Sequence, residues 1–176
     1  MNSFIKANPG RCIGCRTCLI SCVVAHEGRE IFEGGYDDYK FNPRLFMVKT
    51  SSVTAPVHCR HCETPACKAS CAAGAIVMEA GRVLVDARRC IGCKNCVLAC
   101  PFGAMEIVET AQIMPGGEPR RVALKCDLCA GVADSPACVR VCLTDALELV
   151  TETELKDELA EKRRAAVAGA WTPATI

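Results

Sequence analysis

The chain has 176 residues and a formal net charge of +1, which suits one domain or two small ones and excludes a large multidomain enzyme. Aromatic residues make up only 5% of the sequence, whereas cysteine occupies 16 positions. This composition is typical of a chain stabilised by disulfides or metal rather than by a large apolar core. The balanced charge gives no sign of nucleic-acid binding.

The N-terminal segment carries no recognisable export signal. Residues 1–11 lack an apolar core and paired arginines, and no run in the chain approaches the roughly 18–20 apolar residues of a membrane span. We therefore expect a cytoplasmic protein without a membrane span. In a reducing compartment the cysteines are better explained as metal ligands than as disulfides.

The cysteines form four groups of four, and each group begins with C-x2-C and ends with C-x3-C. In chain order the groups are Cys12, Cys15, Cys18 and Cys22; Cys59, Cys62, Cys67 and Cys71; Cys90, Cys93, Cys96 and Cys100; Cys126, Cys129, Cys138 and Cys142. Only the middle gap varies, from two residues in the first and third groups to four in the second and eight in the fourth. This repetition indicates one unit used four times, in the order strand, cysteine loop, short helix and strand.

Short strands are predicted on either side of these loops. One is expected at residues 45–49, after a G-G-Y-D-D-Y stretch at 34–39 whose aromatic residues either contact a partner or cover the outer metal sites. The predicted hairpins pair residues 75–78 with 83–85 and residues 105–108 with 122–124.

The C-terminal segment contains no cysteine and is predicted to be a helix over residues 152–168. It begins with a capping box, T-x-x-E at residues 151–154, and carries a narrow apolar stripe that includes Leu155 and Leu159. Trp171 follows as a candidate interface anchor. We expect this helix and tail to serve self-association, up to filaments, rather than the core. A helix packed on its own domain is the alternative.

The spacing C-x2-C-x2-C wraps three thiolates around one compact object, as a [4Fe-4S] cluster requires. The third group, C-x2-C-x2-C-x3-C-P, matches the bacterial ferredoxin pattern, in which the fourth cysteine binds the other cluster of a pair. Sixteen thiolates therefore suit four [4Fe-4S] clusters. Four zinc sites of four cysteines each remain an alternative, and a zinc ion or a [3Fe-4S] cluster could occupy the widened second or fourth group.

The order of the groups predicts how they pair. The second and third groups lie closest in sequence, so residues 57–108 are expected to form a compact two-cluster unit, around which the outer groups pair. Crossed ligation then exchanges the fourth cysteine within each pair. The four predicted ligand sets are Cys59, Cys62, Cys67 and Cys100; Cys90, Cys93, Cys96 and Cys71; Cys12, Cys15, Cys18 and Cys142; Cys126, Cys129, Cys138 and Cys22.

The four groups, the two R-C-I-G-C starts and Cys100-Pro101 resemble the four-cluster ferredoxin-like electron-transfer subunits of molybdenum, tungsten and nickel enzymes. The resemblance covers about residues 3–150 and is greatest to the short cytoplasmic type attached to formate dehydrogenases, hydrogenases, carbon monoxide dehydrogenases and tungsten aldehyde oxidoreductases. Val23, Ala72 and Leu143 stand where ferredoxins favour proline, which is not a ligand.

The resemblance implies an α+β, duplicated bacterial-ferredoxin-like fold with two nested two-cluster units, short strands and helices, and a C-terminal helix. The expected domains are residues 1–150, with an inner unit at about 57–108 and an outer unit from 1–56 and 109–150, and a C-terminal helix and tail at 151–176.

We expect a non-catalytic subunit that relays electrons between a catalytic molybdenum, tungsten or nickel oxidoreductase subunit and a second redox subunit or ferredoxin. No acid–base pair, phosphate loop or nucleophile motif is evident in the sequence, so no catalytic residue is predicted. A freely diffusing polyferredoxin and a zinc-stabilised interaction module are the alternatives.

Several residues beside the predicted ligands are expected to influence them. Nine are basic, and they either raise cluster potentials, guide an acidic partner or are simply solvated: Arg11, Arg16, Arg60, Lys68, Arg88, Arg89, Lys94, Lys125 and Arg140. Gly14 and Gly92 are expected to let the backbone approach sulfur closely. His58 and His61 are expected beside a cluster or on the surface, and His26 in a structural role.

Overall fold

The computed structural model describes residues 1–28 and 41–169. The G-G-Y-D-D-Y stretch at 34–39 and Trp171 lie outside the described residues. In chain order the elements are β1 (Phe4–Ala7), α1 (Thr17–Glu27), β2 (Phe46–Lys49), β3 (Thr54–Val57), α2 (Ala66–Ala69), β4 (Ile76–Glu79), β5 (Arg82–Val85), α3 (Asn95–Ala99), β6 (Glu106–Ile113), β7 (Pro119–Leu124), α4 (Ala137–Arg140), β8 (Leu147–Val150) and α5 (Glu152–Val167).

The first twelve elements follow one pattern: strand, cysteine loop, short helix and strand occur four times in succession. The helix has four or five residues in the last three repeats and eleven in the first. Small strands and helices combine in an α+β fold, as predicted.

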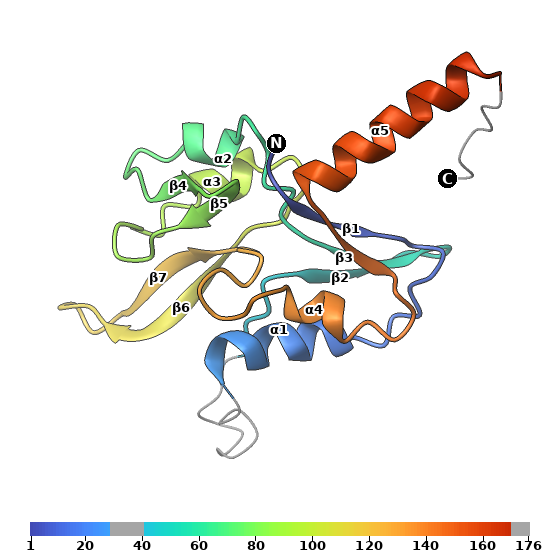
Figure 1. Cartoon of the computed structure of the whole chain (residues 1–176). Coiled ribbons are helices and arrows are strands. Elements are labelled where there is room, and N and C mark those ends of the chain that lie inside the picture. The colour runs from blue at the N-terminus through green and yellow to red at the C-terminus, as the bar shows by residue number, and fades with distance from the viewer. Residues whose placement is uncertain (29–40, 170–176) are drawn as a thin grey trace.

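Within the described residues the strands form four separate two-stranded antiparallel sheets, β1–β8, β2–β3, β4–β5 and β6–β7 (Figure 1). The predicted hairpins are confirmed, with Met78 opposite Val83 in one and Val108 opposite Val122 in the other. Ala80 and Gly81 both have positive φ (47° and 71°), which a tight two-residue hairpin turn favours. The β1–β8 sheet joins the two ends of the cysteine-bearing region, because Phe4 pairs with Val150.

The apolar core is small and is built largely from cysteine. One cluster of buried side chains consists of Ile5, Cys18, Cys22, Leu45, Cys59, Ala104, Cys126, Leu128, Cys138 and Leu147. A second consists of Cys67, Ile76, Val83, Cys96, Met105 and Ala123. The sulfur atoms therefore occupy the interior, where larger apolar side chains stand in most proteins.

Helix α5 extends away from the rest of the molecule (Figure 1). Its capping box is formed as predicted, with the Thr151 hydroxyl accepting from the Glu154 amide and the Glu154 carboxylate accepting from the Thr151 amide. No residue of the helix is buried. The terminal ammonium of Met1 forms an ion pair of 3.1 Å with Glu152 at its first turn. Across the described ranges, none of the helices is long and apolar enough to cross a membrane.

Candidate metal-cluster sites

Three small cavities are each lined by four cysteines from two distant segments. In the first cavity, which we call site A, Cys142 lies with Cys12, Cys15 and Cys18. Site C brings Cys100 to Cys59, Cys62 and Cys67, and site D brings Cys71 to Cys90, Cys93 and Cys96. In each case the fourth cysteine comes from another group, as the crossed arrangement requires.

The remaining four cysteines, Cys22, Cys126, Cys129 and Cys138, are all buried, and we call them site B. Burial raises the pKa of the Cys138 thiol, and the nearby sulfurs of Cys126, Cys22 and Cys129 raise it further. Cys22 also packs with Cys126 and Cys138 in one buried cluster, although more than 100 residues separate it from Cys126 in the sequence.

The helices explain why the fourth cysteine of each group lies at another group's site. The third and fourth cysteines of a group lie on or beside one helix and face two different sites. Helix α1 carries Cys18 of site A and Cys22 of site B one turn apart, and it packs against α4, which carries Cys138 just before Cys142. Helices α2 and α3 pack together in the same way. Sites A and B are therefore neighbours, and so are sites C and D.

Backbone amides point at the cysteine sulfurs. The N–H groups of Ala75, Ala104 and Ala146 donate to Cys71, Cys100 and Cys142 at 3.3, 3.4 and 3.2 Å. Each follows a residue with positive φ, namely Gly74, Gly103 and Asp145. Further amide donors reach Sγ in other loops: Arg44 to Cys22 (3.3 Å), His61 to Cys59 (3.4 Å), Ala123 to Cys90 (3.3 Å), Leu128 to Cys126 (3.5 Å) and Ala137 to Cys129 (3.5 Å).

A second local feature repeats at the start of each group. The residue two positions after the first cysteine has positive φ in all four loops, at Gly14 (70°), His61 (46°), Gly92 (68°) and Leu128 (59°). This conformation turns the chain around each cavity. An added Cβ would lie 2.9 Å from Thr54 Cγ2 at Gly14 and 2.8 Å from the Arg121 carbonyl oxygen at Gly92, so both glycines stand close to other parts of the chain. The expected approach of their backbone to sulfur stays a prediction.

The donor set fits iron–sulfur clusters. Four sulfurs surround each of the three cavities, and hydrogen bonds from amides stabilise thiolate charge. Burial raises the pKa of the Cys18 and Cys67 thiols to about 11 and that of Cys126 to about 12, so ionisation of these thiols must be driven by a bound cationic centre. Within residues 1–28 and 41–169, no three His, Cys, Asp or Glu side chains are arranged to hold a single metal ion.

The four sites differ in exposure. Cys15 in site A and Cys93 in site D are exposed, whereas site B has only buried cysteines and site C has buried or half-buried ones. Large apolar side chains surround the exposed ligands: Ile13 and Leu143 are 67% and 80% exposed at site A, and Ile91 and Leu98 are 71% and 85% exposed near site D. Sites A and D therefore each have a ligand at the surface, site B is buried, and site C has no exposed cysteine although the exposed Phe102 lines it.

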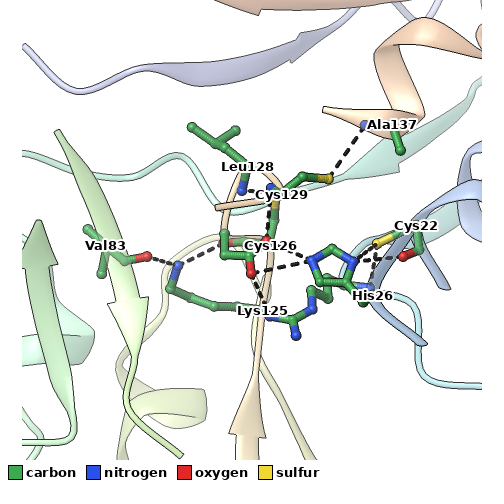
Figure 2. A network of polar contacts seen from close by, with 10 residues as sticks. Cys22, His26, Val83, Lys125, Cys126, Leu128, Cys129 and Ala137 are labelled. Atoms are coloured by element: carbon green, nitrogen blue, oxygen red, sulfur yellow. Dashed lines mark hydrogen bonds and ion pairs between the residues drawn. The ribbon is translucent and has the colours of Figure 1, made fainter. Parts of the chain in front are cut away.

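A polar network joins the loops around site B (Figure 2). His26 donates from Nδ1 to the Cys22 carbonyl oxygen at 2.7 Å, and its Nε2 lies 3.0 Å from Asp127, which also accepts from Arg44 at 2.9 Å. Although burial lowers the pKa of His26, the hydrogen bonds to Asp127 and Cys22 raise it to about 10. His26 is thus a charged structural residue. The sequence showed no sign of its partners, because the three side chains come from distant segments.

On the other side of the Cys126 backbone, Lys125 donates from Nζ to the carbonyl oxygens of Val83 and Cys126 (Figure 2). The amide of the same Val83 donates to His61 Nδ1 at 3.0 Å. His58 and His61 are both buried, which excludes the predicted surface position, and burial lowers their pKa values to about 4 and about 3. Both imidazoles are therefore neutral at physiological pH.

Comparison with known proteins gives three consistent results. The model of the 4Fe-4S dicluster domain matches residues 50–152. Electron transport protein HydN of Escherichia coli (strain K12) is 42% identical over 170 residues, which cover 93% of this chain and 97% of HydN. Hydrogenase-4 component A of the same organism is 35% identical, with 97% of this chain and 92% of that protein covered.

One relative is much longer than this chain. Putative oxidoreductase AegA of Escherichia coli (strain K12) is 43% identical over 164 residues, which cover 93% of this chain but only 24% of AegA. The chain thus spans about a quarter of that protein.

Proposed function

The chain belongs to the family of 4Fe-4S dicluster proteins, and from this membership we propose that it is an electron-transfer subunit whose sixteen cysteines hold four [4Fe-4S] clusters by crossed ligation. The observation that carries the proposal is the meeting of cysteines from separate groups around sites A, C and D. The likeness to HydN over nearly the full length of both chains supports the electron-transfer role.

The ligand sets that we propose are those of sites A to D. Each bound cluster supplies a one-electron redox centre. The protein's own part is to hold the sulfurs in place, to direct amide N–H groups at them and to exclude water from the interior. Since three cysteines of a set come from one loop and the fourth from another, each site also fastens two distant segments together. We infer that the two pairs, A with B and C with D, form the nested outer and inner units of a duplicated ferredoxin-like domain over residues 1–150.

The order of the relay follows from which sites share structure. Helices α1 and α4 join A to B, and α2 and α3 join C to D. Sites B and C are neighbours because Lys125 donates to the carbonyl oxygens of Cys126 at site B and of Val83, which lines the cavity of site C. The sequence of sites is therefore A, B, C, D.

Electrons enter and leave at the two ends, because only sites A and D have an exposed ligand, Cys15 and Cys93. The exposed aliphatic side chains around them suit docking surfaces for two different proteins. We propose a catalytic molybdenum, tungsten or nickel oxidoreductase subunit at one end and a second redox subunit or ferredoxin at the other. The similarity to hydrogenase-4 component A supports a place in an enzyme complex. Thiols that must stay reduced before the clusters assemble favour the cytoplasm.

Catalysis on a substrate is assigned to the partner and not to this chain. The relative AegA is called a putative oxidoreductase, but this chain matches only about a quarter of it.

The proposal is tested by analysis of the anaerobically purified protein. We expect about 16 iron and about 16 acid-labile sulfide per chain, since four [4Fe-4S] clusters need four of each. Oxygen should bleach the protein and loosen its fold, because the clusters substitute for a core. Stoichiometric zinc with little sulfide would instead identify a zinc-stabilised interaction module.

A further inference from the structure

We propose that Lys125 is a positioning residue that sets the reduction potentials of the two inner clusters, at sites B and C, above the values that their burial alone would give. This inference rests on the proposed function, since it requires clusters at both sites. It concerns a residue that binds no cluster but lies between two of them.

Lys125 is buried and held in one place. It follows β7 directly, and only 2% of its surface is exposed. Its Nζ donates to the carbonyl oxygens of Val83 on β5 and of Cys126, the latter at 2.8 Å (Figure 2). The amide of Val83 is in turn fixed by His61. Most lysine side chains keep their ammonium group in water, whereas these hydrogen bonds hold that of Lys125 in the interior.

The ammonium group of Lys125 lies between the two inner sites. Its Nζ donates to the carbonyl oxygen of Cys126, a ligand of site B, and to that of Val83, which lines the cavity of site C.

No carboxylate neutralises this ammonium group in the part of the chain that the structure describes. The nearest acidic residue in sequence, Asp127, is already paired with Arg44 at 2.9 Å and with His26 at 3.0 Å. A buried charge is expensive unless an opposite charge lies near. The negative clusters at sites B and C supply that opposite charge.

The effect on potential follows from charge. Reduction adds one negative charge at a site, and a fixed cation in a medium of low dielectric constant stabilises the reduced state more than the oxidised one. Burial has the opposite effect, because it disfavours the more highly charged state. Lys125 thus offsets the effect of burial at the two sites that have no exposed cysteine.

The repeat supplies a matched control. The residue directly before the first cysteine of each group is basic or a histidine, and it is Arg11, His58, Arg89 or Lys125. Arg89 holds this position at site D but is exposed, so that water screens its charge. Loss of the charge at Arg89 should have little effect, whereas loss of the charge at Lys125 should have a large one.

The experiment is a potentiometric titration, followed by electron paramagnetic resonance, of anaerobic full-length native protein, Lys125→Gln, Lys125→Arg and Arg89→Gln. Iron and sulfide content is measured first in each. We expect Lys125→Gln to lower the potentials of two clusters so that their oxidation–reduction equilibrium constants change at least tenfold, which is about 59 mV for a one-electron couple. The other two clusters should be unaffected. Lys125→Arg and Arg89→Gln should resemble the native protein.

Four clusters with unchanged potentials in Lys125→Gln, or an equal shift at all four, would overturn the role of Lys125 while leaving the relay intact. Absence of iron and sulfide from the native protein would overturn the relay itself. If Lys125→Gln fails to hold four clusters, Lys125→Met, which also removes the charge but keeps the length and the apolar stem of the side chain, is titrated in its place. The clusters that shift are assigned with Cys126→Ser and Cys67→Ser. Unchanged inner potentials in Lys125→Met would refute the proposal, and loss of clusters from both variants would refute it too, because Lys125 would then be needed for assembly of the sites rather than for their potentials.

Discussion

Left-handed backbone at a fixed position of each cysteine loop is what allows a short segment to direct several sulfurs toward one point. Glycine meets this requirement at sites A and D, whereas His61 and Leu128 meet it at sites C and B. The buried His61 uses its ring to bind the Val83 amide, which helps to hold the conformation. The structural need is thus common to all four loops, although the residue that satisfies it differs.

Gly92 is the loop residue at which substitution should cost most. Gly92→Ala places a side chain at φ 68°, which costs about 1–2 kcal/mol, and its Cβ would lie 2.8 Å from the Arg121 carbonyl oxygen. Because the neighbour is backbone of β7, the loop must move, and we expect weaker binding of the cluster at site D and lower thermal stability. The measurement is iron release at rising temperature under anaerobic conditions.

Gly103→Ala is the matched control for this variant. It has a similar φ of 59°, but nothing lies within 4 Å of the added Cβ. It should therefore show the conformational cost without the clash. Equal iron release from the two variants would mean that the contact with Arg121 is unimportant.

At the residue level the sequence predicts the ligands well, because the spacing of cysteines in one loop is a local property. It predicts the surroundings of the ligands poorly. Asp127 and Arg44 meet His26 across distant segments, and Lys125 is one of nine basic residues near ligands, with nothing in the sequence to mark it as the buried one. Burial depends on the assembled fold.

At the level of elements, short helices make the connections between neighbouring sites. Because α1 places Cys18 and Cys22 on two different sites, a single helix cannot lose its position without affecting both. Its partner α4 does the same with cysteines of the fourth group. The packing of these two helices thus couples the first repeat to the last.

Crossed ligation can be tested with one helix. Cys22→Ala should remove the cluster at site B and spare that at site A, although Cys22 belongs to the same group as the site A ligands. Its electron paramagnetic resonance spectrum should lack the same signal as that of Cys126→Ala. Cys12→Ala should lack a different one. If the same signal were lost in Cys22→Ala and in Cys12→Ala, each group would bind its own cluster and crossed ligation would be refuted.

The hairpins were predictable because their two strands are adjacent in sequence and a turn signal lies between them. The sheet formed by β1 and β8 is different. The four residues F-I-K-A do not identify β1 as a strand, and their partner follows at the far end of the cysteine-bearing region, with Lys6 opposite Glu148. Only the requirement that the outer groups meet brings these two segments together.

On the scale of the whole molecule, the small apolar core and the proposed clusters together would stabilise residues 1–150. Helix α5 contributes no buried residue to that core. Its side chains include no buried residue, and its intrahelical ion pairs, Glu152 with Lys156 at 2.7 Å and Glu158 with Lys162 at 2.6 Å, need no other part of the chain. The helix is thus stabilised locally by its cap and its charges. Its apolar residues Leu155 and Leu159 remain available for a partner.

We expect α5 to serve assembly. Deletion of residues 152–176 should leave the iron content and the spectra unchanged, because no ligand and no buried residue is removed from the described part of the chain. The same deletion should reduce the particle mass in light scattering to that of a single chain. Leu155→Gln combined with Leu159→Gln should have the same effect, since both leucines lie on one face of the helix and are half-buried there.

Glu161→Gln is the control for this prediction, because it alters an exposed position of the same helix without changing its apolar face. Its particle mass should equal that of the native protein. An unchanged mass after the deletion would place the assembly contacts elsewhere, with the exposed aliphatic residues at sites A and D as the remaining candidates. Loss of iron after the deletion would show instead that α5 stabilises the cluster domain through its contact with Met1, and that the helix belongs to the fold.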